Sequence, residues 1–330
     1  MTSLFFAPTV ISVAALGLVG IFLGPLAFLT AALLVILEVT LSFDNAVVNA
    51  KVLRTMSPLW QQRFLTWGIF MAVILTRAVL PILIVAASVM SSPWLIAKIA
   101  ATDPQRYAHL LEGAEHIIAS FGGIFLTMVG LKYFFDEGKD VHWIHAVEER
   151  LAHWGSIEAL EIALGLGVLA LVAWLVPAHG LGILFAGIIA IILFIVVQGL
   201  ANAFSASTES VAQAGFALFI YLNILDAAFS LDSVVGAFAL STQLPIIIVG
   251  LGIGAYFVRS LTVYMVRHGT LEQIRYIEHG AHWAILGLAA AMIANLFIDV
   301  PEPVTGLIGL LFVGAAYVSS IRSVHSNIAK

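Results

Sequence analysis

The stretch LEVTLSFDNAVV, residues 37–48, places two carboxylates inside a long apolar run. Glu38 and Asp44 lie six residues apart, and Asn45 directly follows the second acid. A charged side chain at the centre of a membrane helix costs roughly 2.5–3.5 kcal/mol on insertion scales. Such residues therefore face the interior of a helix bundle and meet a partner there, and their default interpretation is functional.

The composition places the chain in the membrane class. Of its 330 residues, 62% are hydrophobic and only 10% are charged, whereas a soluble domain carries about 25% charged residues. The mean hydropathy is +1.08. The net charge of −5 and the lack of a Lys/Arg cluster argue against nucleic-acid binding. The chain has no cysteine, which excludes disulfides, thiolate metal sites and cysteine nucleophiles.

Apolar segments follow one another along the whole chain. They cover residues 9–23, 26–53, 62–91, 107–135, 157–176, 181–200, 211–240, 244–267, 271–297 and 303–322. Runs of this length without period-two alternation predict helices, which can span a bilayer because they satisfy their own backbone groups. We expect an all-α, polytopic transmembrane helix bundle of about nine or ten spans. Pro25 and Pro303 suit the first turns of their helices, and the N-terminus lacks the basic start of a secretory signal, so the first segment is expected to be retained as a helix.

Positive charges fall mostly on alternate connections between these segments. With ten spans and the N-terminus inside, the inner connections and C-terminus hold Lys51, Arg54, Arg63, Lys132, Lys139, Arg150, Arg267, Arg275, Arg322 and Lys330. The outer connections hold only Lys98 and Arg106. Cytoplasmic loops carry an excess of Lys and Arg. The pattern predicts a multi-pass protein of the inner (plasma) membrane with both termini cytoplasmic.

The acidic motif has a second copy. The order acid, serine, acid recurs at the same spacing in Glu38, Ser42 and Asp44 and in Asp226, Ser230 and Asp232. Further matches follow in the same order, namely Arg77 with Arg259, Glu112 with Glu278, and His116 with His282. An ordered set is hard to obtain by chance. A helix would match the one five spans later, and this odd offset predicts inverted repeats over residues 1–176 and 177–330.

We predict a site for a divalent cation and protons between the repeats. Its candidate ligands are Glu38, Ser42, Asp44, Asn45, Asp226, Ser230 and Asp232. Candidate supporting residues or proton relays are Arg77, Arg259, Glu112, His116, Glu278 and His282. Six acids face two arginines, so the surplus must be protonated or neutralised by a cation, although purely structural pairing is the alternative. Oxygen ligands suit Mg²⁺, Ca²⁺ and Mn²⁺. No prosthetic group is expected.

The spacing of the acids adds a geometric expectation. Six residues of regular helix turn through ~600°, which leaves the two acids ~120° apart around the axis. Either the helix unwinds near Ser42–Asp44, or each acid serves a different contact. The spacing from Asp226 to Asp232 poses the same geometry, so we expect the same outcome in both halves. The Glu112/His116 and Glu278/His282 pairs, at i,i+4, are each expected to share one helix face.

The longest polar connection, FDEGKDVHWIHAVEERLAHWG, covers residues 135–155 and is called the insert. Apolar residues recur in it at helical spacing, namely Trp143, Val147, Leu151 and Trp154. An interfacial helix on the inner leaflet fits this pattern. The polar residues His142, His145, Glu149 and His153 fall largely elsewhere, as a solvated face or a metal-sensing set. Residues 136–155 are therefore expected to be a cytoplasmic, interfacial segment.

The paired acidic motifs resemble the signatures of the TerC membrane family, in its DUF475-like branch, over about residues 26–297. That family is similar to the wider group of lysine exporters and cation/proton exchangers. The resemblance implies metal-ion export, with Mn²⁺ as the leading substrate, and a link to tellurium resistance. It also implies that the ion is carried by Glu38, Asp44, Asn45, Asp226 and Asp232. Ser233 stands where a second Asn would complete the symmetry, so the two ligand sets need not be equivalent.

We expect a non-enzymatic membrane protein that exports a divalent cation, Mn²⁺ foremost, in exchange for protons. Its partners would be the lipid bilayer, the metal ion and protons, with a homo-oligomer or cytoplasmic resistance proteins as further partners. One alternative is a Ca²⁺/H⁺ exchanger; another is a small-solute exporter in which Arg77 and Arg259 hold a solute carboxylate. A different class is a non-transporting scaffold that binds partners through residues 136–155. No P-loop supports ATP-driven pumping, and GLGIG (250–254) is interpreted as a helix-packing glycine set.

Overall fold

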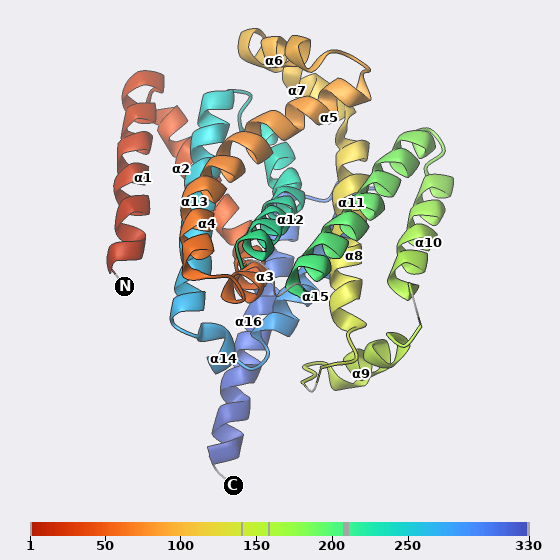
Figure 1. The fold of residues 1–330 in the computed structure, drawn as a ribbon. Helices are drawn as coiled ribbons and strands as arrows, with labels where there is room; N and C mark the ends of the chain where they lie inside the picture. Colours follow the sequence, from red (N-terminus) through yellow and green to blue (C-terminus); the bar gives the residue numbers. More distant parts are fainter. Residues whose placement is uncertain (1, 140, 158, 207–210, 329–330) are drawn as a thin grey trace.

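The computed structural model describes the chain except residues 1, 140, 158, 207–210 and 329–330. For some further helical residues, including Asp232, it describes the backbone but not the side chain. The described part is helical and contains no strand. The helices are α1 Thr2–Leu23, α2 Pro25–Leu41, α3 Phe43–Arg54, α4 Pro58–Phe70, η1 Met71–Val79, α5 Leu80–Ser88, α6 Pro93–Thr102, α7 Pro104–Gly113, α8 Glu115–Phe134, α9 His145–Trp154, α10 Leu160–Leu175, α11 Gly180–Ala206, α12 Val211–Leu240, α13 Leu244–Arg267, α14 Thr270–Gln273, α15 Ile277–Ala294 and α16 Glu302–Ile328 (Figure 1). The expected all-α polytopic bundle is confirmed.

Several helices are long and apolar enough to cross a membrane. Six continuous stretches in the described residues qualify: Leu4–Leu23, Pro58–Ser88, Glu115–Phe134, Gly180–Gly199, Leu244–Arg267 and Ile277–Ala294. The bent pair α2 and α3 makes a seventh candidate, and shorter apolar helices cover Leu160–Leu175, Gly215–Leu231 and Leu307–Ser323. Each predicted apolar segment therefore overlaps at least one of these helices, although segments 26–53, 107–135 and 271–297 are each divided between two helices. A count of ten is reached if the bent pair and all three shorter helices also cross, and a count of nine if any three of these four do.

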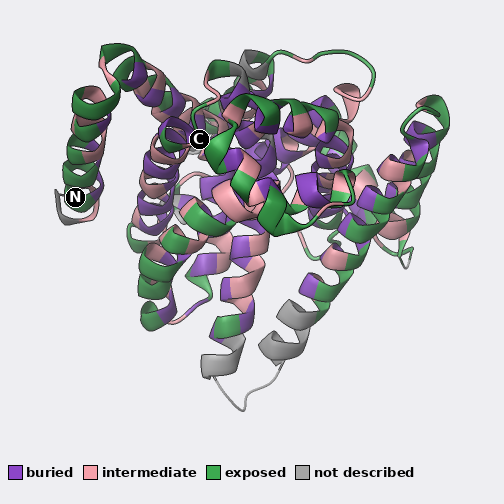
Figure 2. Cartoon of the chain, turned by 90° about the horizontal axis from the view of Figure 1, so that it is seen from above, coloured by how far each residue is buried: buried purple, intermediate pink, exposed green. Residues whose placement is uncertain are grey.

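Helices from the two halves of the sequence pack against each other. In the centre α8 contacts α15, α2 contacts α13, and α8 also contacts α11 and α12. By contrast, α1 and α10 lie at the margins of the bundle and expose much of their apolar surface (Figure 2). The N-terminal end of α1 and the C-terminal end of α16 lie toward the same end of the bundle (Figure 1). Because the halves interleave, the proposed boundary at residues 176 and 177 does not separate two bodies and remains a prediction about repeats.

The contact between α2 and α13 depends on two glycines of the GLGIG segment. A Cβ added at Gly250 would lie 2.6 Å from the Cβ of Leu34, and one at Gly254 would lie 2.5 Å from the Cβ of Glu38. The two glycines are four residues apart and so share a helix face. Small residues at such spacing let membrane helices approach closely. The helix-packing interpretation of this segment agrees with the structure.

The helix of the first acidic motif is broken, and that of the second is not. Ser42 separates α2 from α3 with φ −99° and ψ 15°, and the two helices bend by 54°. α12 runs unbroken from Val211 to Leu240 through the second motif. The predicted unwinding is therefore found in the first half, but the expectation of one geometry in both halves is wrong. Asp226 and Ser230 share a face of α12 at i,i+4, as Glu38 and Ser42 do at the end of α2, so this spacing is not the cause of the bend.

Candidate functional site

The first buried ion pair joins Glu38 of α2 to Arg77 of η1. The guanidinium Nη2 contacts Glu38 Oε1, and both side chains are only 1% exposed. Ser42 Oγ donates to the same carboxylate oxygen at 3.0 Å. Arg77 Nη1 donates to the carbonyl of Ala72 at 2.7 Å and to Thr76 Oγ1 at 3.2 Å. Arg77 lies within a π-helical stretch, a winding that occurs frequently at functional sites.

The second buried ion pair joins Asp226 of α12 to Arg259 of α13. Arg259 Nη2 lies 2.7 Å from Asp226 Oδ2 and donates to Asn223 Oδ1 at 3.3 Å. The guanidinium also lies 4.3 Å from the centre of the Phe64 ring, a cation–π contact. A Cβ at Gly68 would come within 2.4 Å of Arg259 Nη1, so this glycine leaves the room that the guanidinium occupies.

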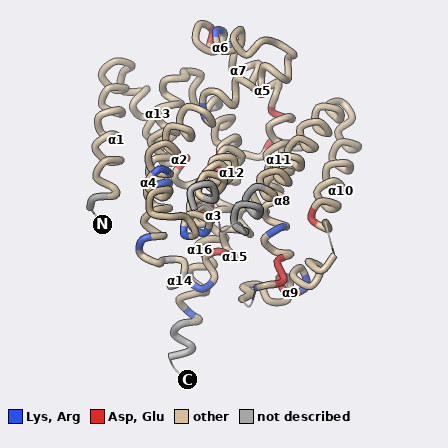
Figure 3. The backbone as a smooth tube through the Cα atoms, viewed as in Figure 1, with Lys and Arg blue, Asp and Glu red and all other residues tan. Residues whose placement is uncertain are grey.

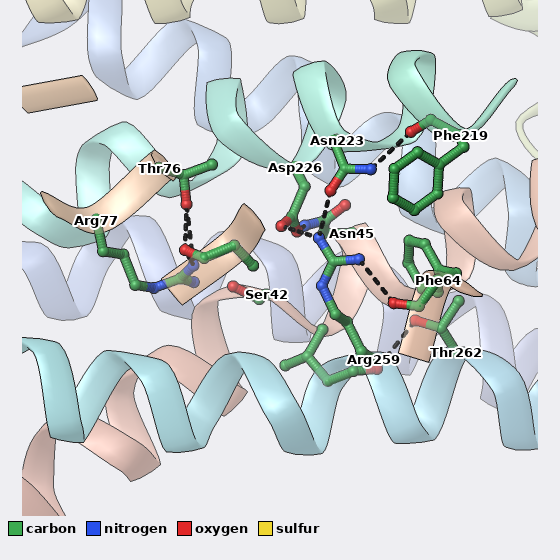
Figure 4. A network of polar contacts seen from close by, with 12 residues as sticks. Ser42, Asn45, Phe64, Thr76, Arg77, Phe219, Asn223, Asp226, Arg259 and Thr262 are labelled. Atoms are coloured by element: carbon green, nitrogen blue, oxygen red, sulfur yellow. Dashed lines mark hydrogen bonds and ion pairs between the residues drawn. The ribbon is translucent and has the colours of Figure 1, made fainter. Parts of the chain in front are cut away.

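Asn45 connects the two halves. Its Nδ2 donates to Asp226 Oδ1 at 2.9 Å, a hydrogen bond between residues 181 positions apart in the sequence. Figure 4 shows Asn45 between Asp226 and the Ser42 region, with Arg77 and Arg259 on either side. The repeat predicts equivalent roles for the two acids and the two arginines, and the structure pairs each acid with the arginine of its own half.

Several buried polar atoms at and around these pairs have no hydrogen-bond partner in the described part of the chain. They are Glu38 Oε2, Asp44 Oδ1, Asn45 Oδ1, Asn49 Oδ1, Ser230 Oγ, Ser260 Oγ, Arg77 Nε and Arg259 Nε. Leaving a buried polar group unsatisfied costs about 1–3 kcal/mol. Most of these atoms are oxygens, which are acceptors for protons and ligands for hard cations. We call the two ion pairs, Asn45 and these atoms the charge centre.

Asp44 lies apart from the Glu38 pair. It occupies the first turn of α3, where a negative charge is favoured by the helix dipole. A Cβ at Gly309 of α16 would lie 3.8 Å from the Asp44 carboxyl carbon, so the acid faces α16. The two acids of the first motif thus serve different contacts, as one of the two alternatives predicted. The Asp232 carboxylate lies outside the described residues, and no group of three or more His, Asp or Glu side chains elsewhere in the description is placed to hold a metal ion.

The predicted Glu112/His116 pair lies at one end of the bundle. The helix is interrupted at Ala114, whose N–H donates to the Leu111 carbonyl in a tight turn. The expectation that Glu112 and His116 share one helix face is therefore wrong, because they belong to α7 and α8. Glu112 is 69% exposed and pairs with His109 at 3.3 Å.

A cavity of about 270 Å³ opens beside these residues, and we call it the outer cavity. It is lined by Glu112, Glu115, His116, His179 and Asn295, among others. The rings of His116 and His179 stack with their centres 4.3 Å apart. Glu115 Oε1 accepts a hydrogen bond from Asn295 Nδ2 at 2.9 Å. The predicted residues at this end thus line a polar hollow rather than contacting either ion pair.

The Glu278/His282 pair lies at the opposite end, on α15. Glu278 forms an ion pair with Lys51 at 3.0 Å, and His282 Nδ1 is 2.7 Å from the Glu278 carbonyl oxygen. His282 and Lys51 line a cavity of about 610 Å³ together with Val48, Tyr133 and Tyr221, among others. We call this the inner cavity. The outer cavity is lined by residues near the start of α8, and the inner cavity by residues near its end.

Sequence reasoning missed several residues of the site. Asn49, Asn223 and Glu148 are buried polar residues that were not singled out. The packing positions could have been found by extending the repeat, because the spacing small–x₃–small–x₄–Arg occurs in Gly68, Ala72 and Arg77 and again in Gly250, Gly254 and Arg259. Asn223 and Glu148 belong to no repeated pattern in the sequence, and their importance depends on contacts made by other helices.

Comparison with known protein families gives a match to DUF475, described as a protein of unknown function, over residues 43–327. No curated protein and no solved structure gives a significant match. Because the family match covers most of the chain, the chain belongs to the DUF475 family.

Proposed function

We propose that this member of the DUF475 family exports a divalent cation, Mn²⁺ foremost, across the inner (plasma) membrane in exchange for protons. The observation that supports this proposal is the charge centre, in which two buried acid–arginine pairs meet through the Asn45–Asp226 hydrogen bond. The proposal includes the relationship to the TerC family and to tellurium resistance, a non-enzymatic role without a prosthetic group, and cytoplasmic termini.

The charges of the buried acids provide the basis for exchange. Arg77 offsets Glu38, and Arg259 offsets Asp226. Two motif acids, Asp44 and Asp232, have no arginine of their own in the motif pattern. Two surplus carboxylates match the charge of one divalent cation or of two protons. The metal ion and the protons compete for the same carboxylate oxygens. Proton binding on one side of the membrane would therefore release the metal ion there.

The chemistry of the unpartnered atoms favours a hard cation. Glu38 Oε2, Asn45 Oδ1 and Ser230 Oγ are buried oxygens that have no hydrogen-bond partner among the residues the structure describes. Carboxylate, amide and hydroxyl oxygens suit Mg²⁺, Ca²⁺ and Mn²⁺. The preference for Mn²⁺ over Ca²⁺ comes from the TerC resemblance, so a Ca²⁺/H⁺ exchanger uses the same centre and differs only in ion selectivity.

The two cavities supply the access that a transporter needs. They lie at opposite ends of α8, and inverted repeats allow alternate opening toward either side of a membrane. Outside the centre, Lys and Arg residues lie mainly around α9, α14 and α16, with α6 at the other end (Figure 3). By the positive-inside rule, the end with α9 and α14 is the cytoplasmic one. Glu112 and Glu115 line the outer cavity and would attract a cation there.

A small-solute exporter is the second candidate, and a specific observation favours it. The Nε atoms of Arg77 and Arg259 are buried and have no acceptor among the described residues. A planar guanidinium binds carboxylates well. An amino acid could therefore place its carboxylate on an arginine and its amino group on one of the acids of the centre.

A flux assay in proteoliposomes tests the proposal and separates these candidates. We expect Mn²⁺ movement that is driven by a proton gradient, falls at least tenfold in Asp44→Asn and Asp232→Asn, and is unchanged in Glu149→Gln, an exposed acid of α9. Movement of Ca²⁺ alone would assign the selectivity to calcium, and movement of amino acids without metal would support the second candidate. Transport of none of these, with no metal binding by the purified protein, would refute the transporter and favour the scaffold.

A further inference from the structure

The insert docks onto the inner end of α15 through one buried carboxylate. Glu148 of α9 is 2% exposed. It accepts hydrogen bonds from His279 Nδ1 at 2.7 Å and from Trp283 Nε1 at 2.8 Å, both on α15. It also accepts from the backbone N–H groups of Trp143 and Ile144 at 2.8 and 3.3 Å. Both carboxylate oxygens are therefore satisfied, two donors coming from the insert and two from the membrane bundle.

The ionised state of Glu148 strengthens this contact. Burial by itself would raise the pKa of Glu148, but the hydrogen bonds from His279, Trp283 and Trp143 lower it to about 2. The carboxylate is thus charged throughout the physiological range, and hydrogen bonds to a charged group are about twice as strong as neutral ones. The next acid in the sequence, Glu149, is 65% exposed and pairs with His145 of the same helix at 3.2 Å, so it contributes nothing to the docking.

The docked insert also forms a wall of the inner cavity. Phe135, Asp136, Glu137, Gly138 and Gly155 line it from this side. A Cβ at Gly155 would lie 1.8 Å from the Phe135 carbonyl oxygen, so the two ends of the insert are pressed together. The segment is therefore a loop whose two ends lie together and line one side of the cavity.

Contacts between aromatic and cationic side chains also join the insert to the helices around the inner cavity. Lys139 of the insert donates to the Tyr133 carbonyl and lies 3.0 Å from the centre of the Tyr133 ring. The same ring stacks on His282 of α15 with centres 3.5 Å apart. The insert, the end of α8 and the start of α15 are thereby joined into one packed unit around the cavity.

The inner cavity ends close to the charge centre. Val48 lines the cavity and follows Asn45 on α3 by three residues, which places both on neighbouring positions of one helix face. Asn45 in turn donates to Asp226. The lining of the inner cavity therefore lies one helical turn of α3 away from the charge centre.

We propose that the insert is a lid over the inner mouth of the pathway to the charge centre, and that Glu148 is the positioning residue that holds this lid against α15. The identity of the species that passes beneath the lid rests on the proposed function. The position of the lid and its attachment can be tested without any transport, and of the proposed function they use only the cytoplasmic orientation of this end.

The absence of cysteine makes the chain its own background for a labelling experiment. A Val48→Cys reporter in the full chain is exposed to a membrane-impermeant maleimide in inverted membrane vesicles. We expect Glu148→Gln to raise the labelling rate about tenfold, because it weakens hydrogen bonds to a buried charged group. Glu149→Gln, the adjacent exposed acid, should leave the rate at the parental value. An Ala119→Cys reporter in the outer cavity, labelled in right-side-out vesicles, should also be unaffected by Glu148→Gln.

A second variant guards against loss of folding. Trp283→Phe removes one donor to Glu148 and keeps an aromatic ring against Phe134, whose ring centre lies 4.6 Å away. We expect it to raise Val48→Cys labelling by a smaller factor than Glu148→Gln. If Glu148→Gln does not elute as a folded protein, the labelling rate of Val48→Cys in Trp283→Phe tests the lid instead.

The possible results separate the lid from the transporter. Parental labelling rates in both Glu148→Gln and Trp283→Phe would overturn the lid, as would an equal increase in Glu149→Gln. Faster labelling in a protein that moves no ion or solute would support the lid and refute the proposed function. Unchanged labelling in a protein that transports Mn²⁺ would refute the lid alone.

Discussion

Replacing Arg259 with methionine tests whether the second ion pair is the electrostatic support of the centre. Arg259→Met keeps a long apolar side chain but removes the charge that lies 2.7 Å from Asp226 Oδ2. Among the described residues, Asp226 would retain only the hydrogen bond from Asn45 at 2.9 Å. A buried carboxylate with one neutral donor is poorly compensated, because desolvation of an ion costs several kcal/mol.

The magnitude follows from the geometry. Two charges 4 Å apart attract by about 4 kcal/mol at an effective dielectric constant of 20, and the pair here is closer. Removing one partner of a buried pair typically costs about 3–5 kcal/mol in the free energy of unfolding. The double variant Asp226→Asn/Arg259→Met removes both charges. Its free energy of unfolding is lowered only by the lost hydrogen bonds, at about 1 kcal/mol each. We therefore expect the double variant to be more stable than Arg259→Met by about 2 kcal/mol.

Unfolding in mixed micelles with increasing SDS, followed by tryptophan fluorescence, measures these differences. Arg150→Met, at an exposed position of α9, is the matched control and should change the free energy of unfolding by less than about 0.5 kcal/mol. Two results would show that the ion pair is not the support inferred from its geometry. One is that the effects of Asp226→Asn and Arg259→Met on the free energy of unfolding simply add in the double variant. The other is that Arg259→Met lowers the free energy of unfolding by less than about 1 kcal/mol.

Two further predictions concern packing and protonation. Gly254→Ala should lower the free energy of unfolding by about 1–3 kcal/mol through overpacking against Glu38, whereas Gly167→Ala, which has open space around it, should be neutral or stabilising by up to about 1 kcal/mol in the same SDS titration. Burial and the nearby charge of Lys51 lower the pKa of Lys139 to about 7, so its docked form gains stability as pH rises from about 7 towards the ordinary lysine value. Its acylation rate, read by peptide mass spectrometry, should reach half of its maximum near pH 7, and a midpoint above pH 9 would contradict this.

Local properties of the sequence were enough to predict the helices. The apolar segments, from residues 9–23 to residues 303–322, correspond to helices because composition and length decide whether a segment can be buried in a bilayer. Pro25 and Pro303 stand in first turns as expected. The repeated acids were also visible in the sequence, since a charge in an apolar run is conspicuous wherever the chain folds.

The partners of those acids could not be read in the same way. The spacing from Glu38 to Asp44 indicated that one regular helix could not aim both acids at one point, but the same spacing in α12 is accommodated without a break. Whether a helix bends depends on the contacts that the bend gains, and these come from other helices. Glu148 has neighbours in the sequence that resemble it, and only its position beneath α15 makes it buried.

The sequence by itself determined that this is a multi-helix membrane protein, where the acids and arginines within its apolar segments lie, and that the acidic motifs occur as two related sets. Composition, hydrophobic length and repetition are properties of the chain that no particular packing can change. The tertiary structure decided that each acid pairs with the arginine of its own half, that Asn45 reaches Asp226 across 181 positions, and that the insert lies against the inner cavity. These depend on distances between residues far apart in sequence, which exist only once the helices have packed.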